Sequence, residues 1–146
     1  MSELPSSDSK HPARQAAWRS IDAVARGDKQ AWLDNFADDA IVEDPIGKSI
    51  IDPTGEGHRG KAAIEEFWDA NIANARPMFS LQRSICCGNE CANVGTLTVQ
   101  FPNGMVTQLY GVFVYRVNDD GKVTSLRTYW ETEDMQVYPP FEERGT

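Results

Sequence analysis

The sequence predicts a single α+β domain, an α+β roll in which a cone-shaped, curved, antiparallel or mixed β-sheet wraps around N-terminal α-helices. Two patterns indicate this architecture. Apolar residues recur at helical spacing from Pro12 to about Ile72, with one short extended stretch between helices, and strand-like alternation dominates after Pro77. A strongly bent sheet around a helix forms a cone, and the interior of a cone can hold a ligand.

Length and composition fit one domain. A chain of 146 residues can bury a substantial core, and contents of 40% hydrophobic and 25% charged residues are ordinary for a folded domain. Residues 1–12 are rich in Ser, Asp and Pro without periodicity, and residues 136–146 are Pro-rich and acidic. We therefore expect one domain over residues 13–135, with a flexible tail at 1–12 and a C-terminal tail at 136–146.

Charge and residue usage exclude several classes of partner. A formal net charge of −8 disfavours nucleic acids and anionic membrane surfaces. The sequence has no apolar run of about 18 residues and no apolar signal segment, so a cytoplasmic location is expected. Its 3 cysteines crowd into residues 86–91 and it has 2 histidines, too few ligands for a metal site, so neither a metal nor a cofactor is expected.

Three helices are predicted in the first half. Pro12 suits the first turn of a helix that runs to about Arg26 and ends at Gly27. Asp28 caps a second helix whose apolar stripe ends with Phe36. A third helix begins near Gly60.

A short strand from Ala40 to Asp44 follows the second helix and is stopped by Pro45. Val42 and Asp44 point to the same side of this strand. If Val42 packs inward, the Asp44 carboxylate enters an apolar interior, where desolvation raises its pKa and suits it to take a proton from carbon. The alternative is that Asp44 only accepts a turn hydrogen bond before Pro45.

The remaining segments are a polar loop and four strands. The loop over residues 48–60 contains two turns, and it either covers a pocket as a lid or is a surface insertion. The four strands are predicted at Met78–Cys86, Ala92–Phe101, Met105–Val117 and Lys122–Glu133.

Several of these segments resemble the bacterial ketosteroid isomerases. The matching segments are Gly27-Asp28, Phe36–Ala40, Val42–Gly47, Gly60–Ile64 with Phe67, Val114–Val117, Asp120–Val123 and Tyr129-Trp130. The resemblance covers roughly Pro12 to Met135. That family belongs to the cone-shaped superfamily named after nuclear transport factor 2, which includes the SnoaL-like polyketide cyclases, and the resemblance therefore implies a cystatin-like α+β roll.

The resemblance implies an activity, a ligand and a base. It implies an apolar pocket for a steroid or similar polycyclic ketone, and a steroid delta-isomerase reaction in which Asp44 moves a proton between two carbons. It also implies a homodimer formed through the outer face of the sheet. Candidates for that face are Val94, Thr96, Thr98, Val112 and Val114, although periodicity alone does not distinguish the inside of the sheet from the outside.

The other polar positions of the family site differ in this sequence. Ser20 stands where the family has its oxyanion tyrosine, and Phe113 stands where it has a protonated aspartic acid. Phe36 and Trp68 replace two supporting tyrosines.

Replacements are available from the same strands. Tyr115 shares a strand face with Phe113 and Leu109, so its phenol is the candidate oxyanion donor and the second candidate catalytic residue beside Asp44. The candidate ligand-binding residues are Trp18, Ser20, Phe36, Trp68, Leu109, Phe113, Thr128 and Trp130. The alternative for the aromatic residues among them is a purely structural place in the core.

Three functions are compatible with these residues. The first is an isomerase that uses Asp44 as its base. The second is a non-catalytic binder of steroids or other apolar ligands, because the family's oxyanion donors are absent. The third is a different reaction on the same fold, such as that of a SnoaL-like polyketide cyclase or an epoxide hydrolase.

Overall fold

The computed structural model describes residues 4–6 and 8–140, so parts of both predicted tails lie outside the described residues. The helices are α1 (Pro12–Arg26), α2 (Lys29–Asp34) and α3 (Gly60–Asn71), with a short 3-10 helix, η1, at Thr132–Asp134. The strands are β1 (Phe36–Glu43), β2 (His58–Arg59), β3 (Arg76–Cys87), β4 (Glu90–Gln100), β5 (Val106–Val117), β6 (Val123–Tyr129) and β7 (Gln136–Tyr138).

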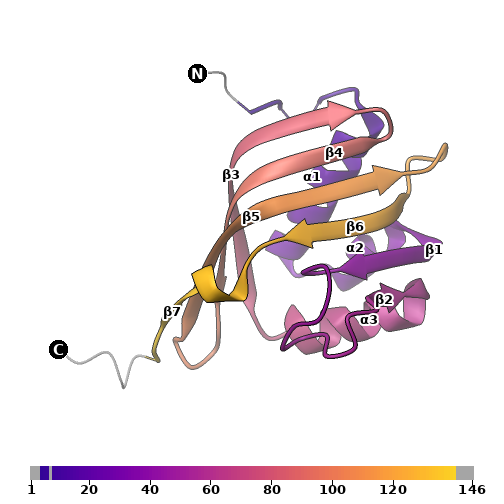
Figure 1. Ribbon diagram of the computed structural model, residues 1–146. Helices are drawn as coiled ribbons and strands as arrows, with labels where there is room; N and C mark the ends of the chain where they lie inside the picture. The colour runs from indigo at the N-terminus through magenta and orange to yellow at the C-terminus, as the bar shows by residue number, and fades with distance from the viewer. Residues whose placement is uncertain (1–3, 7, 141–146) are drawn as a thin grey trace.

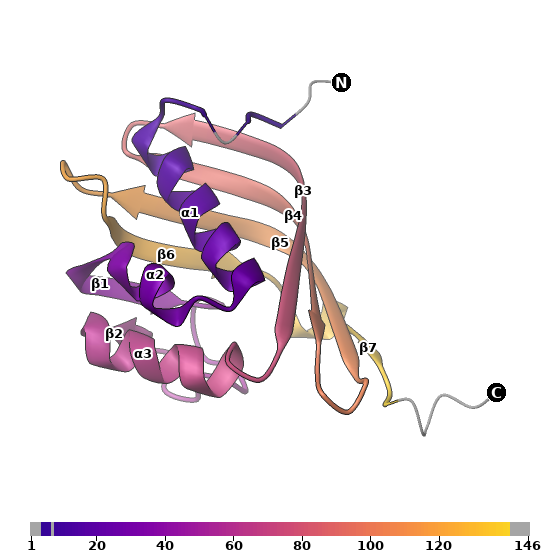
Figure 2. The ribbon, with the colours of Figure 1, turned by 180° about the vertical axis from the view of Figure 1, so that it is seen from behind.

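All strands belong to one curved sheet. Its order is β2-β1-β6-β5-β4-β3, and β7 pairs with β5. The β1–β6 pair is parallel and the other pairs are antiparallel. Figures 1 and 2 show α1, α2 and α3 on the concave side of this sheet, while its other face is uncovered. The predicted α+β cone with a mixed sheet is therefore confirmed.

Local signals set the start and end of α1 and the start of α2 where the sequence predicted them. Pro12 opens α1, and Gly27 ends it in the left-handed region at φ 67°, where a residue without Cβ is favoured. Asp28 then caps α2, because its Oδ1 accepts a hydrogen bond from the Ala31 N–H at 3.0 Å.

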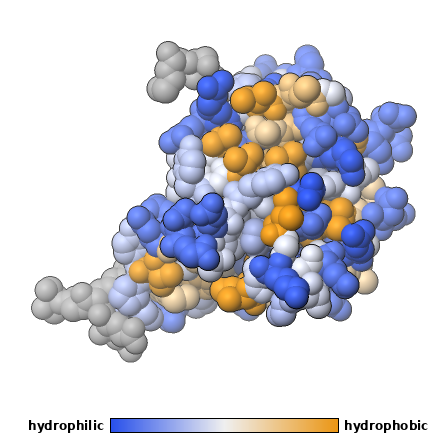
Figure 3. Space-filling view, viewed as in Figure 1, coloured by the Kyte–Doolittle hydropathy of each residue, from blue (hydrophilic) through white to orange (hydrophobic). Residues whose placement is uncertain are grey.

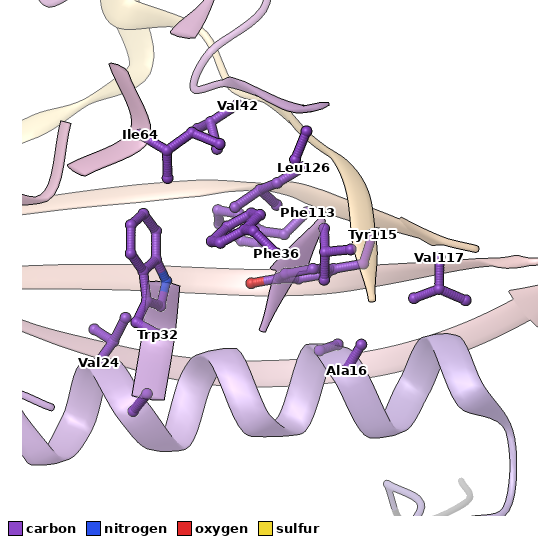
Figure 4. Packing of buried hydrophobic residues seen from close by; sticks show 14 of the residues in the cluster. Ala16, Val24, Trp32, Phe36, Val42, Ile64, Phe113, Tyr115, Val117 and Leu126 are labelled. Atoms are coloured by element: carbon purple, nitrogen blue, oxygen red, sulfur yellow. The ribbon is translucent and has the colours of Figure 1, made fainter. Parts of the chain in front are cut away.

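The core lies between α1 and the concave face of the sheet. Ala13, Ala16 and Ala17 are fully buried, and their small side chains allow α1 to approach the strands closely. Above them, Trp32 contacts Phe36 edge-to-face with ring centroids 4.8 Å apart. Figure 4 shows buried residues converging from α1, α2, α3, β1, β5 and β6.

Gly95 of β4 and Gly111 of β5 are paired directly. A Cβ atom on Gly95 would lie 2.3 Å from the Ser80 carbonyl oxygen, and one on Gly111 would lie 2.5 Å from the Tyr129 carbonyl oxygen. The neighbouring strands can therefore approach this pair closely only because side chains are absent.

Three predicted boundaries were wrong. Phe36 is the first residue of β1 rather than the end of the second helix, because β1 begins its parallel pairing with β6 at Phe36 and Val123. β1 is consequently longer than the predicted Ala40–Asp44 strand. The last long strand stops at Tyr129, before η1, and the two-residue β2 and the three-residue β7 were not predicted.

The outer face of the sheet is partly apolar. Val94, Thr96, Thr98, Val112 and Val114 are half-buried, whereas alternate residues of the same strands point to the core. Figure 3 shows apolar side chains interspersed with polar ones over this face. Within the described part of the chain, no helix has the length and apolar character needed to cross a bilayer.

Candidate active site

A cavity of about 310 Å³ lies between the concave face of the sheet and the helices. We call it the inner cavity. Its polar lining groups are Ser20, Asp44, Asn71, Thr107, Tyr115 and the indole of Trp130. Its remaining lining residues are Val24, Trp32, Ile50, Ile51, Phe67, Ile72, Pro77, Phe79, Leu97, Val99, Phe101, Met105, Leu109, Leu126 and Met135. The site is therefore an apolar container with a few separated polar groups, as expected for a small-molecule pocket.

Asp44 enters the inner cavity because of the strand that precedes it. Val42 of β1 is fully buried, and Asp44, two residues further along, points to the same side and lines the cavity. The Asp44–Pro45 peptide bond is cis, and β1 ends at Glu43. Glu43 faces the other way and forms an ion pair with Arg127 at 3.1 Å. The two adjacent carboxylates thus have separate environments.

The Asp44 carboxylate is held on one side only. The Thr128 hydroxyl donates to Asp44 Oδ1 at 2.5 Å, and the Trp130 indole N–H donates to the same oxygen at 2.9 Å. Trp130 Nε1 also lies 3.1 Å from Thr128 Oγ1, so the three side chains form a closed group. No described residue donates a hydrogen bond to Oδ2, which leaves that oxygen available to accept a proton.

Burial raises the pKa of Asp44 above its ordinary value. The hydrogen bonds from Thr128 and Trp130 and the charge of His58 act in the opposite direction, but desolvation is the largest effect. A carboxylate with a raised pKa is a stronger base than an aspartate in water. This property suits abstraction of a proton from carbon.

Tyr115 and Ser20 form a second polar group in the inner cavity. The Tyr115 hydroxyl donates to Ser20 Oγ at 3.0 Å, and both side chains are buried. Figure 4 shows the Tyr115 hydroxyl directed away from Val117 and toward Trp32. Burial raises the pKa of Tyr115, so the phenol stays protonated near neutral pH. Because Tyr115 donates to Ser20 Oγ, the Ser20 hydroxyl hydrogen can point to another acceptor.

The loop between β1 and β2 forms part of the cavity wall. Ile50 and Ile51 line the inner cavity. The buried Asp52 organises the loop, because its Oδ2 accepts from the Gly57 N–H at 2.9 Å and its Oδ1 accepts from the Gly55 N–H at 3.2 Å. Of the two alternatives for this loop, the structure favours a cover over the pocket.

The structure brings Asp44, Tyr115, Ser20, Leu109 and Trp130 together in the inner cavity. Thr128 does not line the cavity, but it contacts Asp44 directly.

Four other predicted ligand-binding residues do not line the inner cavity, and each has a different packing partner. The Trp18 indole donates to the Pro5 carbonyl oxygen at 3.2 Å, on the N-terminal segment. Phe36 and Trp68 pack around Trp32, with ring centroids 4.8 Å and 5.2 Å from it. Phe113 packs edge-on against Phe79 at 5.3 Å.

Sequence patterns missed much of the apolar wall. Trp32 belongs to the apolar stripe of α2 and was expected in the core, but it also lines the inner cavity. Asn71 and Thr107 carried no signal, because one lies at the end of a helix and the other within an alternating strand. Among the described residues, no group of three or more His, Cys, Asp or Glu side chains is arranged to hold a metal ion.

Comparison with known proteins shows the family to which this chain belongs. A family model described as the SnoaL-like domain matches residues 17–126, well over half of the chain. The chain belongs to the SnoaL-like domain family. Within it, the chain is 33% identical over 128 residues to the Steroid Delta-isomerase of Nocardioides simplex, a match that covers 86% of this chain and 95% of that protein.

Solved structures agree with this assignment. The crystal structure of the Delta 5-3-ketosteroid isomerase from Mycobacterium sp. has a TM-score of 0.85 and 40% identity, covering 88% of this chain and 99% of that one. RV0760c from Mycobacterium tuberculosis in complex with estradiol-17beta-hemisuccinate has a TM-score of 0.83 and 36% identity, covering 87% and 99%. The predicted resemblance to ketosteroid isomerases within the SnoaL-like family is confirmed.

Proposed function

We propose that this protein binds a steroid or a similar polycyclic ketone in the inner cavity and isomerises it by intramolecular proton transfer, with Asp44 as the general base. The observation that supports this most strongly is the one-sided anchoring of Asp44 in an apolar container. Its Oδ1 is held by Thr128 and Trp130, while Oδ2 has no partner among the described residues. An anchored carboxylate whose second oxygen faces a cavity is placed to exchange a proton with a bound molecule.

The proposed reaction has two proton transfers. Asp44 Oδ2 takes a proton from the carbon between the carbonyl and the isolated double bond, and the C–H electron pair moves into a dienolate whose charge lies on the carbonyl oxygen. The protonated Asp44 then returns the proton to the far carbon of the dienolate. The double bond becomes conjugated with the ketone, and no atom is gained or lost.

The Ser20–Tyr115 pair is the proposed support for the dienolate oxygen. Tyr115 donates to Ser20, and the Ser20 hydroxyl can donate onward to the ligand oxygen. A donor in such a place typically stabilises the transition state by about 3–4 kcal/mol, or roughly 10²–10³ in rate. This pair would replace the family's tyrosine and aspartic acid donors, whose positions hold Ser20 and Phe113.

The relatives support the reaction and the ligand class. The Nocardioides simplex relative is a Steroid Delta-isomerase, and the mycobacterial structure is a ketosteroid isomerase. A further relative was solved with estradiol-17beta-hemisuccinate.

A non-catalytic steroid binder is the second candidate. The observation that favours it is that Ser20 and Phe113 stand where the family has its donors, which leaves Tyr115, two residues after Phe113 on β5, as the phenol nearest these positions. Such a protein would keep the apolar cavity and release its ligand unchanged.

We also propose a homodimer that covers the outer face of the sheet. Tyr110 and Tyr129 are 56% and 49% exposed on this face, beside the half-buried Val112 and Val114. Exposed aromatic side chains around an apolar strip are typical of protein interfaces. Analytical ultracentrifugation of the wild type and of Val112→Asp tests this proposal. A monomer in both samples would exclude it.

The test of the activity uses 5-androstene-3,17-dione, with absorbance of the conjugated enone as the measurement. The wild type is expected to turn over and Asp44→Asn to lose activity while remaining folded by circular dichroism. If the wild type instead shows no conversion above background but the steroid quenches tryptophan fluorescence, the binder is the better description. Absence of both signals would exclude both candidates.

A further inference from the structure

The polar groups of the inner cavity lie in two separate places. Asp44, Trp130 and the Ser20–Tyr115 pair form one group, which the proposed reaction uses. Asn71 and Thr107 form the other, and the proposed reaction does not use them. The other side chains that line the inner cavity are apolar, apart from the indole N–H of Trp32 and the sulfur of methionine. We call Asn71 and Thr107 the distal pair.

Sheet register shows that Thr107 lies far from the reacting end. Thr107 pairs with Val99, and Val99 pairs with Pro77, so these residues form one row across the sheet. Thr128, which anchors Asp44, pairs with Phe113, six residues further along β5. Six residues of extended strand span at most about 20 Å, and the curvature of the sheet shortens that distance.

Asn71 lies at the same distal end. It is the last residue of α3, which leads through a short connection to β3, where Pro77 belongs to the Thr107 row. Figure 2 shows the C-terminal end of α3 close to the start of β3 and to the hairpin between β4 and β5. A long ligand with its ketone at the Ser20–Tyr115 pair would therefore extend toward the distal pair.

Both distal side chains have unused hydrogen-bonding groups. The Asn71 carboxamide donates one N–H to the Phe67 carbonyl oxygen at 3.2 Å, and its Oδ1 and second N–H have no partner among the described residues. The Thr107 hydroxyl makes no side-chain hydrogen bond within the described part of the chain. Both are half-buried in an apolar wall, where an unpaired polar group costs free energy until a ligand or water satisfies it.

We propose that Asn71 and Thr107 bind a second oxygen of the ligand, at the end opposite the reacting ketone. The distal pair is then a second polar subsite in the wall of the inner cavity, separate from the group around Asp44. This inference rests on the proposed function and adds to it a subsite for the far end of the ligand.

The test compares two non-reacting ligands that differ in one oxygen: androst-4-ene-3,17-dione and androst-4-en-3-one. Their dissociation constants are measured by quenching of tryptophan fluorescence, since Trp32 and Trp130 line the inner cavity. The wild type is expected to bind the dione roughly five- to tenfold more tightly, the usual net effect of one hydrogen bond. Thr107→Val and Asn71→Ala are expected to reduce this ratio while changing the affinity for the mono-ketone little.

Two further variants serve as controls. Thr107→Ser keeps the hydroxyl and is expected to keep the preference for the dione. Thr96→Val makes the same substitution as Thr107→Val on the outer face of the sheet and is expected to leave both affinities unchanged.

Equal affinity of the wild type for the two steroids would overturn the inference, as would an unchanged ratio in both Thr107→Val and Asn71→Ala. Either result leaves the proposed function intact. If neither steroid binds to the wild type, the proposed function and the distal subsite both fail.

Discussion

The Tyr115 hydroxyl donates a hydrogen bond to Ser20 Oγ at 3.0 Å, which links β5 to α1 inside the inner cavity. The small side chain of Ser20 leaves room beside α1 for the phenol of Tyr115, which comes from the sheet. This relationship makes the proposed oxyanion support testable.

Ser20→Ala is expected to lower the turnover of 5-androstene-3,17-dione by about 10²-fold or more, because it removes the hydroxyl proposed to donate to the dienolate oxygen. Tyr115→Phe is also expected to lower turnover, because Ser20 loses the donor that orients its hydroxyl. Product affinity is expected to change little. Combining Tyr115→Phe with Ser20→Ala is expected to cost about as much as one of the single changes, since the two hydroxyls act as one unit. Steady-state kinetics of the three variants measure this, and fully additive losses would show that the hydroxyls act separately.

The pH profile of kcat/KM is expected to have an acid limb above the ordinary aspartate pKa of about 3.9, because burial raises the pKa of Asp44. The base must be ionised, so activity falls as the pH drops through the raised pKa. An acid limb at or below the ordinary aspartate pKa would contradict the proposal that the base is a desolvated Asp44.

Thr128→Val is expected to raise the pKa of Asp44 further, because it removes a hydrogen bond to the ionised carboxylate. The acid limb then moves to higher pH, while Thr128→Ser keeps the donor and is expected to restore the original limb. A uniform loss of activity with no movement of the limb would indicate that Thr128 has only a packing role.

Asp44→Asn is expected to raise the free energy of unfolding at pH 7. A carboxyl group whose pKa is higher in the folded state than in the unfolded state is disfavoured as an anion by folding. Its unfavourable effect on stability is absent below the unfolded pKa and develops as the pH rises toward the folded pKa. Thermal melts at pH 7 should show a higher Tm, by roughly 2–4 °C for each kcal/mol. An unchanged or lower Tm would contradict this prediction.

Asp52→Ala is expected to raise KM more than it lowers kcat, because Asp52 orders the loop that brings Ile50 and Ile51 to the inner cavity. Asp52 does not line the cavity itself, so the chemical step should be little affected. The exposed Glu56 in the same loop offers a control, since Glu56→Ala removes a carboxylate without disturbing these hydrogen bonds. Equal kinetics for the two variants would mean that loop order is unimportant for binding.

Local patterns in the sequence were sufficient for the helix starts, the four long strands and the inward direction of Asp44. Caps, prolines, glycines and the alternation around Val42 act over a few residues, so the sequence displays them directly. The start of β1 at Phe36 was missed because it depends on parallel pairing with β6, which is about 90 residues away in the chain.

The wall of the site was predicted less well for a geometric reason. Phe113 and Tyr115 share one face of β5, but Tyr115 lines the inner cavity whereas Phe113 packs against Phe79. Alternation identifies the inner face of a strand, but not where the sheet bends. At the Gly95–Gly111 pair the neighbouring strands approach closely. The shape of the cavity wall there depends on which strands lie on either side of the pair, and the pattern of a single strand does not contain that information.

The anchoring of Asp44 has a consequence for biosynthesis. The residues that hold its carboxylate follow it by 84 and 86 positions, on the last long strand and directly after it. During synthesis the base is made early, but it has neither donor until Thr128 and Trp130 have left the ribosome and β6 has paired with β1. A nascent or truncated chain that ends before β6 therefore has the acidic residue without its two anchoring donors, and the proposed proton transfer requires a chain that extends past Trp130.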